Sequence, residues 1–400
     1  MDLELTRSLV VPNTTKLVLL SADGLGGLPH PDTGRSELET ARIPNLDALA
    51  ARSVCGLVRH VAPGITPGSG PGHLGLFGYD PLKYPVGRGV LEALGIDFEL
   101  RAGDVAARGN FCTVDREGRI TDRRAGRITT ELCVSLCQRL RAIRLEGVEV
   151  FVEPVKEHRF VLVLRGPGLS GRLTETDPQA LGVPPLAVKP LAPEAERTAA
   201  LVNRFVERAG SLLAAATPAN MVLLRGFDRL PELPSFPELY RLRAAAIAAY
   251  PMYRGLARLV GMEVLKTGAT FAEEVTTLRQ HWEGHDFFFL HYKDTDNAGE
   301  DGDFAAKVGA LERLDRFIPE MLDLKPDVLV VTGDHASPAI LKGHGWQPVP
   351  VLLWSLYCGA DLVSQFTERA CASGSLGVFP AQDLMPLILA NGLRLTKFGA

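Results

Sequence analysis

The 400-residue sequence has no long apolar run, no excess of basic residues and no paired-cysteine motif. Its longest apolar stretches are strand-sized and end in charged residues, which excludes a membrane-spanning helix. The net charge of −4 argues against nucleic acid as a partner, because phosphate backbones demand a concentrated basic face. Residues 1–16 lack the basic start and apolar run of a signal peptide, so we expect a cytoplasmic protein with no membrane partner.

The sequence also has few cysteines and lacks a glycine motif for nucleotide binding at its first predicted strand. The six cysteines are scattered, and Cys133 and Cys137 have helical i, i+4 spacing instead of the C-x-x-C spacing. We therefore expect buried, reduced cysteines and neither disulfides nor a zinc site built from them. The segment "ADGLGG" lacks a G-x-G-x-x-G pattern, which excludes a Rossmann dehydrogenase.

Three apolar runs share one design, at residues 17–24, 286–296 and 327–335. Each is predicted to be a buried strand that ends abruptly in Asp, His or Gly, a pattern typical of parallel strands with functional loops at their carboxyl ends. Apolar spacing predicts a helix over 303–322 after the second strand, with Asp303 as its N-cap. The predicted fold is α/β, with a doubly wound sheet.

The middle of the chain has a different pattern of elements. It predicts strand and turn segments, two helices and a Pro-rich stretch over 177–194. We interpret residues 108–240 as a smaller α/β lobe inserted into the sheet domain, which then comprises residues 1–107 and 241–400.

Several acidic and imidazole side chains fall at the predicted strand ends. Asp23, Asp296, Asp334 and His335 lie at or just beyond the carboxyl ends, which converge in a parallel sheet. Carboxylates brought together repel unless they are protonated or bind a metal, and mixed oxygen and imidazole ligands suit Mn²⁺, Zn²⁺ or similar ions. Asp296 and Glu300 add an i, i+4 carboxylate pair. The alternative is a coincidence of capping and solvated residues.

The segment "APGITPGSGPGHLGLFGYDP", residues 62–81, surrounds Ser69 with glycine and proline. Ser69 stands at the start of a predicted short helix, where the helix dipole and a nearby metal would lower the pKa of its hydroxyl and make it a nucleophile. The glycines would let a phosphate approach backbone N–H groups. The alternative is that Ser69 is a simple N-cap.

These residues resemble a known family. The segments "SADGLGG", "TPGSGPGHLGLFGYDP", "TDNAGEDGDF" and "GDHASPAILKGHGWQPVP" run in order along the chain and are similar to the alkaline phosphatase superfamily, and within it to the archaeal-type, cofactor-independent phosphoglycerate mutases. The resemblance implies an alkaline-phosphatase-like fold and a binuclear metal site with two ligand sets. The first set is Asp23, Ser69, Asp334 and His335. The second set is Asp296, Glu300 and His344.

Two positions depart from the family pattern. Glu300 stands where histidine is commoner, and this harder oxygen ligand favours Mn²⁺ or Mg²⁺ over Zn²⁺. We therefore expect two divalent ions, Mn²⁺ first, with Mg²⁺, Co²⁺ or Zn²⁺ as alternatives. Gly70 stands where many relatives carry an acidic residue beside the nucleophile, which would alter proton handling.

The resemblance also implies a glycolytic reaction, in which Ser69 takes the phosphoryl group of 3-phosphoglycerate and returns it to the 2-hydroxyl. Arginines of the inserted lobe suit the substrate's carboxylate and phosphate. The candidate substrate-binding residues are Arg108, Asn110, Arg124, Arg159, Arg225 and Arg254. A metal-dependent phosphatase or other phosphoryl transferase on the same scaffold is the first alternative, and a non-catalytic binding protein is the second. The sequence leaves the oligomeric state open, and a homo-oligomer is compatible with it.

Overall fold

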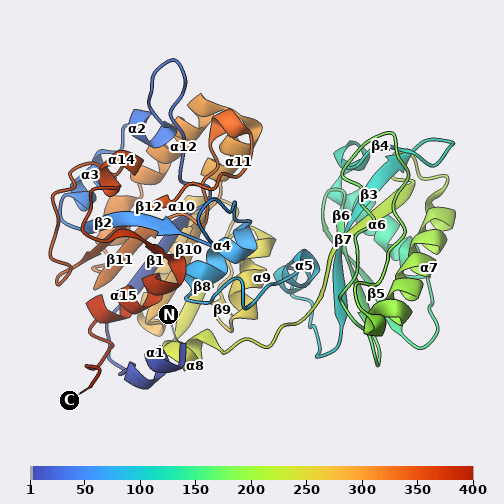
Figure 1. Cartoon of the computed structure of the whole chain (residues 1–400), viewed down its shortest axis with the longest axis horizontal. Coiled ribbons are helices and arrows are strands. Elements are labelled where there is room, and N and C mark those ends of the chain that lie inside the picture. The colour runs from blue at the N-terminus through green and yellow to red at the C-terminus, as the bar shows by residue number, and fades with distance from the viewer. Residues whose placement is uncertain (1–2, 400) are drawn as a thin grey trace. The chain divides into compact units, whose positions relative to one another are not determined.

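The computed structural model describes residues 3–399, which form two units (Figure 1). The first unit comprises Met1–Pro85 and Leu233–Ala400, and the second, Val86–Glu232, is inserted between its parts. These boundaries differ from the sequence-based ones at both ends. A boundary at 107/108 would cut the strand Val105–Val114, and a boundary at 240/241 would remove Phe236, which packs against aromatic rings of the first unit.

The first unit is built on an eight-stranded sheet, in the order β13-β2-β12-β11-β1-β10-β8-β9. At its centre β1 is parallel to β10 on one side and to β11 on the other. β12 runs antiparallel to both of its neighbours, so the sheet is mixed at one end. The strands are β1 (Leu17–Ala22), β2 (Val54–Arg59), β8 (Ala244–Ile247), β9 (Glu263–Val264), β10 (Phe287–Tyr292), β11 (Val328–Thr332), β12 (Val349–Ser355) and β13 (Gly377–Pro380).

Helices cover both faces of this sheet. Successive residues of a strand point to opposite faces, and in β10 Leu290 joins an apolar cluster with α3 and α12, whereas Phe289 contacts Phe77 beyond the end of α4. The doubly wound α/β fold predicted from the sequence is therefore confirmed. The helices are α1 (Leu3–Leu9), α2 (Glu37–Thr40), α3 (Pro44–Ala50), α4 (Ser69–Leu76), α8 (Phe236–Tyr240), α9 (Pro251–Leu259), α10 (Phe271–Gln280), α11 (Asp294–Asp301), α12 (Phe304–Asp315), α13 (Ile318–Leu322), α14 (Glu368–Cys371) and α15 (Leu384–Asn391).

The helix predicted over 303–322 begins as expected. The Asp303 side chain caps α12 by accepting a hydrogen bond from the Ala306 N–H at 2.9 Å. The single helix is wrong, however, because the chain breaks after Asp315 and α13 follows with Pro319 in its first turn. Proline lacks the N–H that would continue the preceding helix, so it is accommodated where a new one begins.

The second unit has its own sheet and its own core. β3 pairs with β6 and β7 on its two sides, while β5 extends the sheet beyond β6 and β4 pairs with the end of β3. The helices α6 and α7 contribute apolar residues to one core cluster with these strands. The elements are α5 (Arg88–Gly95), β3 (Val105–Val114), β4 (Ile120–Asp122), α6 (Thr130–Leu140), β5 (Glu149–Lys156), β6 (Arg159–Arg165), α7 (Glu196–Leu213) and β7 (Met221–Arg229).

The structure also describes the cysteines and the apolar character of the helices. All six cysteines are free thiols, and Cys358 is the one that is not buried. Among residues 3–399 no helix has the length and apolar character needed to cross a bilayer.

Candidate active site

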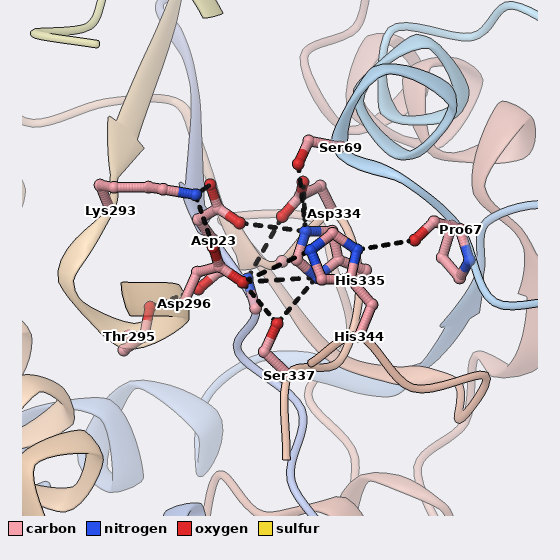
Figure 2. A network of polar contacts seen from close by, with 12 residues as sticks. Asp23, Pro67, Ser69, Lys293, Thr295, Asp296, Asp334, His335, Ser337 and His344 are labelled. Carbon is pink, nitrogen blue, oxygen red and sulfur yellow. Dashed lines mark hydrogen bonds and ion pairs between the residues drawn. The ribbon is translucent and has the colours of Figure 1, made fainter. Parts of the chain in front are cut away.

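The polar strand ends meet at the centre of the large sheet. Asp23 follows β1, Asp296 lies in the first turn of α11 after β10, and Asp334 and His335 follow β11. Because these three strands are parallel neighbours in one register, their carboxyl ends bring the four side chains into one buried cluster (Figure 2).

The first ligand set converges on one imidazole nitrogen. His335 Nε2 lies 3.2 Å from Asp23 Oδ1, 3.2 Å from Asp334 Oδ2 and 3.3 Å from Ser69 Oγ. Atoms that share a divalent ion at 2.0–2.2 Å are separated by about 3.0–3.6 Å, so these spacings fit a common ion. Asp23 Oδ1 and Asp334 Oδ2 are buried, and no described residue gives either oxygen a hydrogen bond of good geometry, although His73 Nδ1 lies 3.1 Å from Asp334 Oδ2. Two such carboxylate oxygens aimed at one point suit a cation.

Ser69 is presented by the start of α4. Gly68 is the N-cap and Ser69 is the first helical residue, so the Ser69 side chain does not stand at the capping position. The alternative that Ser69 serves as a simple N-cap is therefore wrong. The hydroxyl instead faces His335, and only 7% of the residue is exposed.

The second ligand set is more open. His344 Nε2 lies 3.8 Å from Asp296 Oδ1 and 3.5 Å from Glu300 Oε1, and the Glu300 side chain is 54% exposed. The His344 ring stacks on His335 at 3.6 Å, and its Nδ1 lies 2.9 Å from the Pro67 carbonyl oxygen. Burial lowers the pKa of His344, but the hydrogen bonds with Glu300 and Pro67 outweigh it and raise the pKa to about 9. Binding a metal there would displace that proton.

Three residues that the sequence did not single out converge on the second oxygen of Asp23. Asp23 Oδ2 accepts hydrogen bonds from Lys293 Nζ at 2.8 Å and from the Tyr253 hydroxyl, and lies 3.0 Å from His291 Nε2. Tyr253 stacks on His291 with ring centroids 3.5 Å apart. With Oδ2 saturated in this way, Oδ1 is the oxygen left for a metal.

Lys293 also joins the two carboxylates electrostatically. Its Nζ lies 2.6 Å from Asp296 Oδ2, so one ammonium contacts a carboxylate of each set. Burial alone raises the pKa of Asp23, yet Lys293 and the neighbouring imidazoles hold that pKa well below its usual value. A signal for these residues was present in the sequence, since His291 and Lys293 interrupt the apolar run of β10 where it ends.

His73 and Ser337 complete the surroundings of the first set. His73, on α4, is fully buried, and its Nδ1 lies 3.1 Å from Asp334 Oδ2 and 2.9 Å from the Ser69 carbonyl oxygen. Ser337 lies beside His335 and Asp296. Neither residue could be selected from the sequence, because a lone His after glycine or a lone Ser before proline is common.

The structure places four of the substrate-binding candidates on one face of the second unit's sheet. Arg108 and Asn110 are two residues apart in β3 and so point to the same face. Arg108 is paired with Arg225 of β7, and Asn110 is paired with Arg159 of β6. Arg225 Nε donates a hydrogen bond to Glu175 Oε2 at 3.0 Å, so the guanidinium charge is already paired with a carboxylate before any anion binds. Asn110 Oδ1 is buried and accepts no hydrogen bond among the described residues.

The two remaining candidates are not on these strands, although the charge of Arg124 acts on His158, a further residue that belongs with the four. Arg124 is exposed after β4, and Arg254 belongs to α9 of the first unit, next to Tyr253. His158, which the sequence did not select, is 2% exposed just before β6. Burial and the charges of Arg159, Arg108, Arg124 and Arg127 lower the pKa of His158 to about 4. Burial is the largest cause of this shift, and the positive charges of the arginines act in the same direction.

Comparisons with known proteins agree on one family. A family model described as 2,3-bisphosphoglycerate-independent phosphoglycerate mutase matches residues 50–220. A protein of Thermotoga neapolitana, named probable 2,3-bisphosphoglycerate-independent phosphoglycerate mutase, is 51% identical over 394 residues, covering 98% of both chains. A protein of the same name from Thermus thermophilus is 49% identical over 399 residues and also covers 98% of both chains.

Solved structures extend the likeness to the fold. A cofactor-independent phosphoglycerate mutase from Thermoplasma acidophilum has a TM-score of 0.70 and 31% identity, covering 94% of this chain and 100% of that one. A Pyrococcus horikoshii protein has a TM-score of 0.85 and 28% identity, covering 97% and 100%. Because the identity reaches 51% along nearly the full length, the chain belongs to the family of 2,3-bisphosphoglycerate-independent phosphoglycerate mutases.

Proposed function

We propose that this protein interconverts 3-phosphoglycerate and 2-phosphoglycerate without bisphosphoglycerate, and that Ser69 carries the phosphoryl group between the two positions. The names of the relatives support the reaction. The observation that carries the mechanism is the position of the Ser69 hydroxyl at the start of α4, 3.3 Å from His335 Nε2 and beside the buried carboxylates of Asp23 and Asp334.

The donor set fits two divalent ions. Asp23, Asp334 and His335 form one group of ligand atoms within 4.8 Å of one another, and we add Ser69 to it. Asp296, His335 and His344 form another such group, and we add Glu300 to it. Oxygen-rich donors favour Mn²⁺. Such ions supply a lowered pKa for the Ser69 hydroxyl and compensation for charge on the transferring phosphoryl group. The chain itself orients the donors, since Lys293 and Tyr253 fix one oxygen of Asp23.

The two half-reactions balance in bonds and protons. In the first, Ser69 Oγ bonds to phosphorus while the bond between phosphorus and the 3-oxygen breaks, the serine proton leaves and the 3-oxygen gains one. In the second, the 2-oxygen of the same glycerate bonds to phosphorus, the bond to Ser69 Oγ breaks, and the protons move in the opposite sense. Both displacements are in-line transfers stabilised by positioning and charge.

Substrate retention is the role we assign to the arginine cluster. Arg108, Arg159 and Asn110 share a sheet face with Arg225, and guanidinium groups bind carboxylate and phosphate in bidentate fashion. Arg124 and Arg254 are further candidates for the same role. Holding glycerate while excluding water separates a mutase from a phosphatase, because water would hydrolyse the phosphoserine. The cytoplasm, where thiols stay reduced, suits the six free cysteines.

The test is an assay of both products. Purified protein with Mn²⁺ and 3-phosphoglycerate, without bisphosphoglycerate, should form 2-phosphoglycerate and little free phosphate. Ser69→Ala should abolish the product, whereas Ser355→Ala should not, because the Ser355 hydroxyl contacts Asn391 away from the ligand sets. Free phosphate as the main product would replace the mutase with the phosphatase alternative, and full activity in Ser69→Ala would exclude the assigned nucleophile.

A further inference from the structure

Ser337 touches both ligand sets with one hydroxyl group. Its Oγ lies 2.5 Å from Asp296 Oδ1, in the second set, and 3.2 Å from His335 Nδ1, in the first (Figure 2). Ser337 is fully buried. A buried hydroxyl has to find its hydrogen-bond partners inside the protein, and Ser337 finds one in each ligand set.

The fold fixes the direction of this hydroxyl. The Ser337 N–H donates to the carbonyl oxygens of Gly24 at 3.3 Å and Gly26 at 3.1 Å, and the Ser337 carbonyl accepts from Lys307 Nζ at 2.7 Å. Gly24 has a φ of +66°, and a Cβ there would lie 2.7 Å from Ser337 Oγ. A glycine directly after Asp23 therefore makes room for the hydroxyl, and the buried ammonium of Lys307 holds its backbone in place.

The hydroxyl contacts determine where the His335 proton sits. A hydroxyl has one hydrogen, and an ionised carboxylate only accepts, so the Ser337 hydrogen points to Asp296. The Ser337 oxygen is then left to accept from its other neighbour, and a neutral His335 meets that need with a proton on Nδ1. With its proton on Nδ1, the ring directs the lone pair of Nε2 toward Asp23 and Asp334.

His335 has a second neutral tautomer, with the proton on Nε2, and the contact with Ser337 opposes it. The carboxylate oxygens 3.2 Å from Nε2 are acceptors, so without a metal they favour a proton on Nε2, which would block that nitrogen as a ligand. We propose that Ser337 is a positioning residue that holds His335 in the Nδ1–H tautomer and links the two metal-ligand sets. The inference rests on the proposed metal site, because a tautomer matters only if Nε2 binds an ion.

The first test needs no metal. Two-bond ¹H–¹⁵N spectra of metal-free, ¹⁵N-histidine-labelled protein above neutral pH distinguish a protonated ring nitrogen from an unprotonated one, and His335→Gln assigns the signals. Ser337→Ala should raise the population of the Nε2–H form of His335, while Ser53→Ala, which removes a buried hydroxyl bonded to the Leu49 carbonyl, should not. An unchanged tautomer ratio in Ser337→Ala overturns the inference, whatever the enzyme's activity.

The second test measures metal affinity by calorimetric titration of Mn²⁺ into each variant. Ser337→Ala should weaken binding of both ions by about 10- to 100-fold, the usual effect of removing a partner that orients a ligand. Ser53→Ala should bind as the wild type does. Circular dichroism and metal-free melting confirm that the variants are folded. Weakening of one ion alone overturns the link between the sets, and wild-type protein that binds no Mn²⁺ removes the metal site itself while leaving the tautomer measurement to decide the role of Ser337.

Discussion

Glu300 Oε1 lies 3.5 Å from His344 Nε2, across the more open of the two ligand sets. The carboxylate reaches the imidazole from α11, one turn beyond Asp296, whose Oδ1 lies 3.8 Å from the same imidazole nitrogen. Glu300 thus takes the place where the family resemblance leads one to expect histidine. A carboxylate is a harder donor than an imidazole, so we expect this position to influence which metal binds.

Glu300→His should move metal preference toward Zn²⁺. We expect the ratio of Zn²⁺ to Mn²⁺ affinity to rise by about tenfold, or about 1.4 kcal/mol, because an imidazole replaces an anionic oxygen. Competition dialysis with elemental analysis measures the ratio directly. Glu283→His, in the turn Trp282–Gly284 that follows α10, is the control for an added histidine. Equal selectivity in Glu300→His and wild type would place Glu300 outside the metal site.

Lys293→Met should destabilise the metal-free protein much more than the metal-bound one. The ammonium of Lys293 contacts both Asp23 and Asp296, and removing one partner of a buried charge cluster costs about 3–5 kcal/mol. Divalent cations restore the missing positive charge, so Mn²⁺ should recover part of the loss. Urea unfolding with and without Mn²⁺ checks this, with the exposed Lys266→Met as control. Unchanged metal-free stability would contradict the electrostatic role.

The convergence of four candidate ligands could be predicted because it follows from strand polarity. An apolar run that stops at Asp23, Asp334 or His335 places those side chains at a carboxyl end, and parallel strands collect such ends at one edge. The sheet order, which makes β1, β10 and β11 neighbours, then completes the site. Neither step needs knowledge of side-chain packing.

The residues around the ligands could not be predicted in the same way. Tyr253 reaches Asp23 from α9, 230 positions away in sequence, and Ser337 acts through the rotamer of one hydroxyl. Such contacts depend on how the helices pack on the sheet. The spacing of apolar residues along the sequence carries no information about that packing. The domain boundary failed for a related reason, since α5 belongs to the second unit by packing on β3 and β7.

Gly72→Ala should displace α4 from the end of β11. A Cβ at Gly72 would lie 2.1 Å from the Asp334 carbonyl oxygen, so backbone must move. Gly72 therefore allows α4 to pack closely against the loop at Asp334. This role is separate from the approach of a phosphate that we expected the glycines to allow. We expect a loss of about 1–3 kcal/mol in unfolding free energy and a marked loss of activity, since Ser69 opens the same helix.

The control for that substitution is Gly284→Ala, where an added Cβ meets nothing within 4 Å. Urea unfolding and the mutase assay should leave this variant close to wild type. If Gly72→Ala also behaves as wild type in both measurements, the tight approach of α4 to Asp334 does not exist in solution.

Glu274→Gln should flatten the pH dependence of stability. Burial raises the pKa of Glu274 to about 8 in the folded protein, from 4.5 as the ordinary value, although the Ala249 N–H opposes the rise. The folded state therefore keeps a proton that the unfolded state releases, and stability falls as pH rises from about 4.5 through about 8, by up to about 1.4 kcal/mol per pH unit. Glutamine stays neutral and can still accept from Ala249, so the variant should be more stable than wild type above the folded pKa.

Urea unfolding at a series of pH values across that window measures the difference between Glu274→Gln and wild type. Glu283→Gln serves as the control for removing an ordinary glutamate charge. Parallel stability curves for Glu274→Gln and wild type would show that Glu274 is ionised throughout the window.

The inserted unit should fold alone when it is cut where the structure divides the chain. The fragment 86–232 keeps α5, all of β3 and the hydrogen bond at 2.7 Å from the Gly87 N–H to Asp228 Oδ2, which joins its two ends. The fragment 108–240 loses these features, including the buried Val90 and Leu91, and each such side chain contributes about 1.5–3 kcal/mol. Cooperative urea unfolding is therefore expected for the first fragment, with a lower midpoint or no transition for the second. Equal midpoints would mean that α5 adds nothing to the core of this unit. The sequence-based boundaries at 108 and 240 would then describe the folding unit equally well.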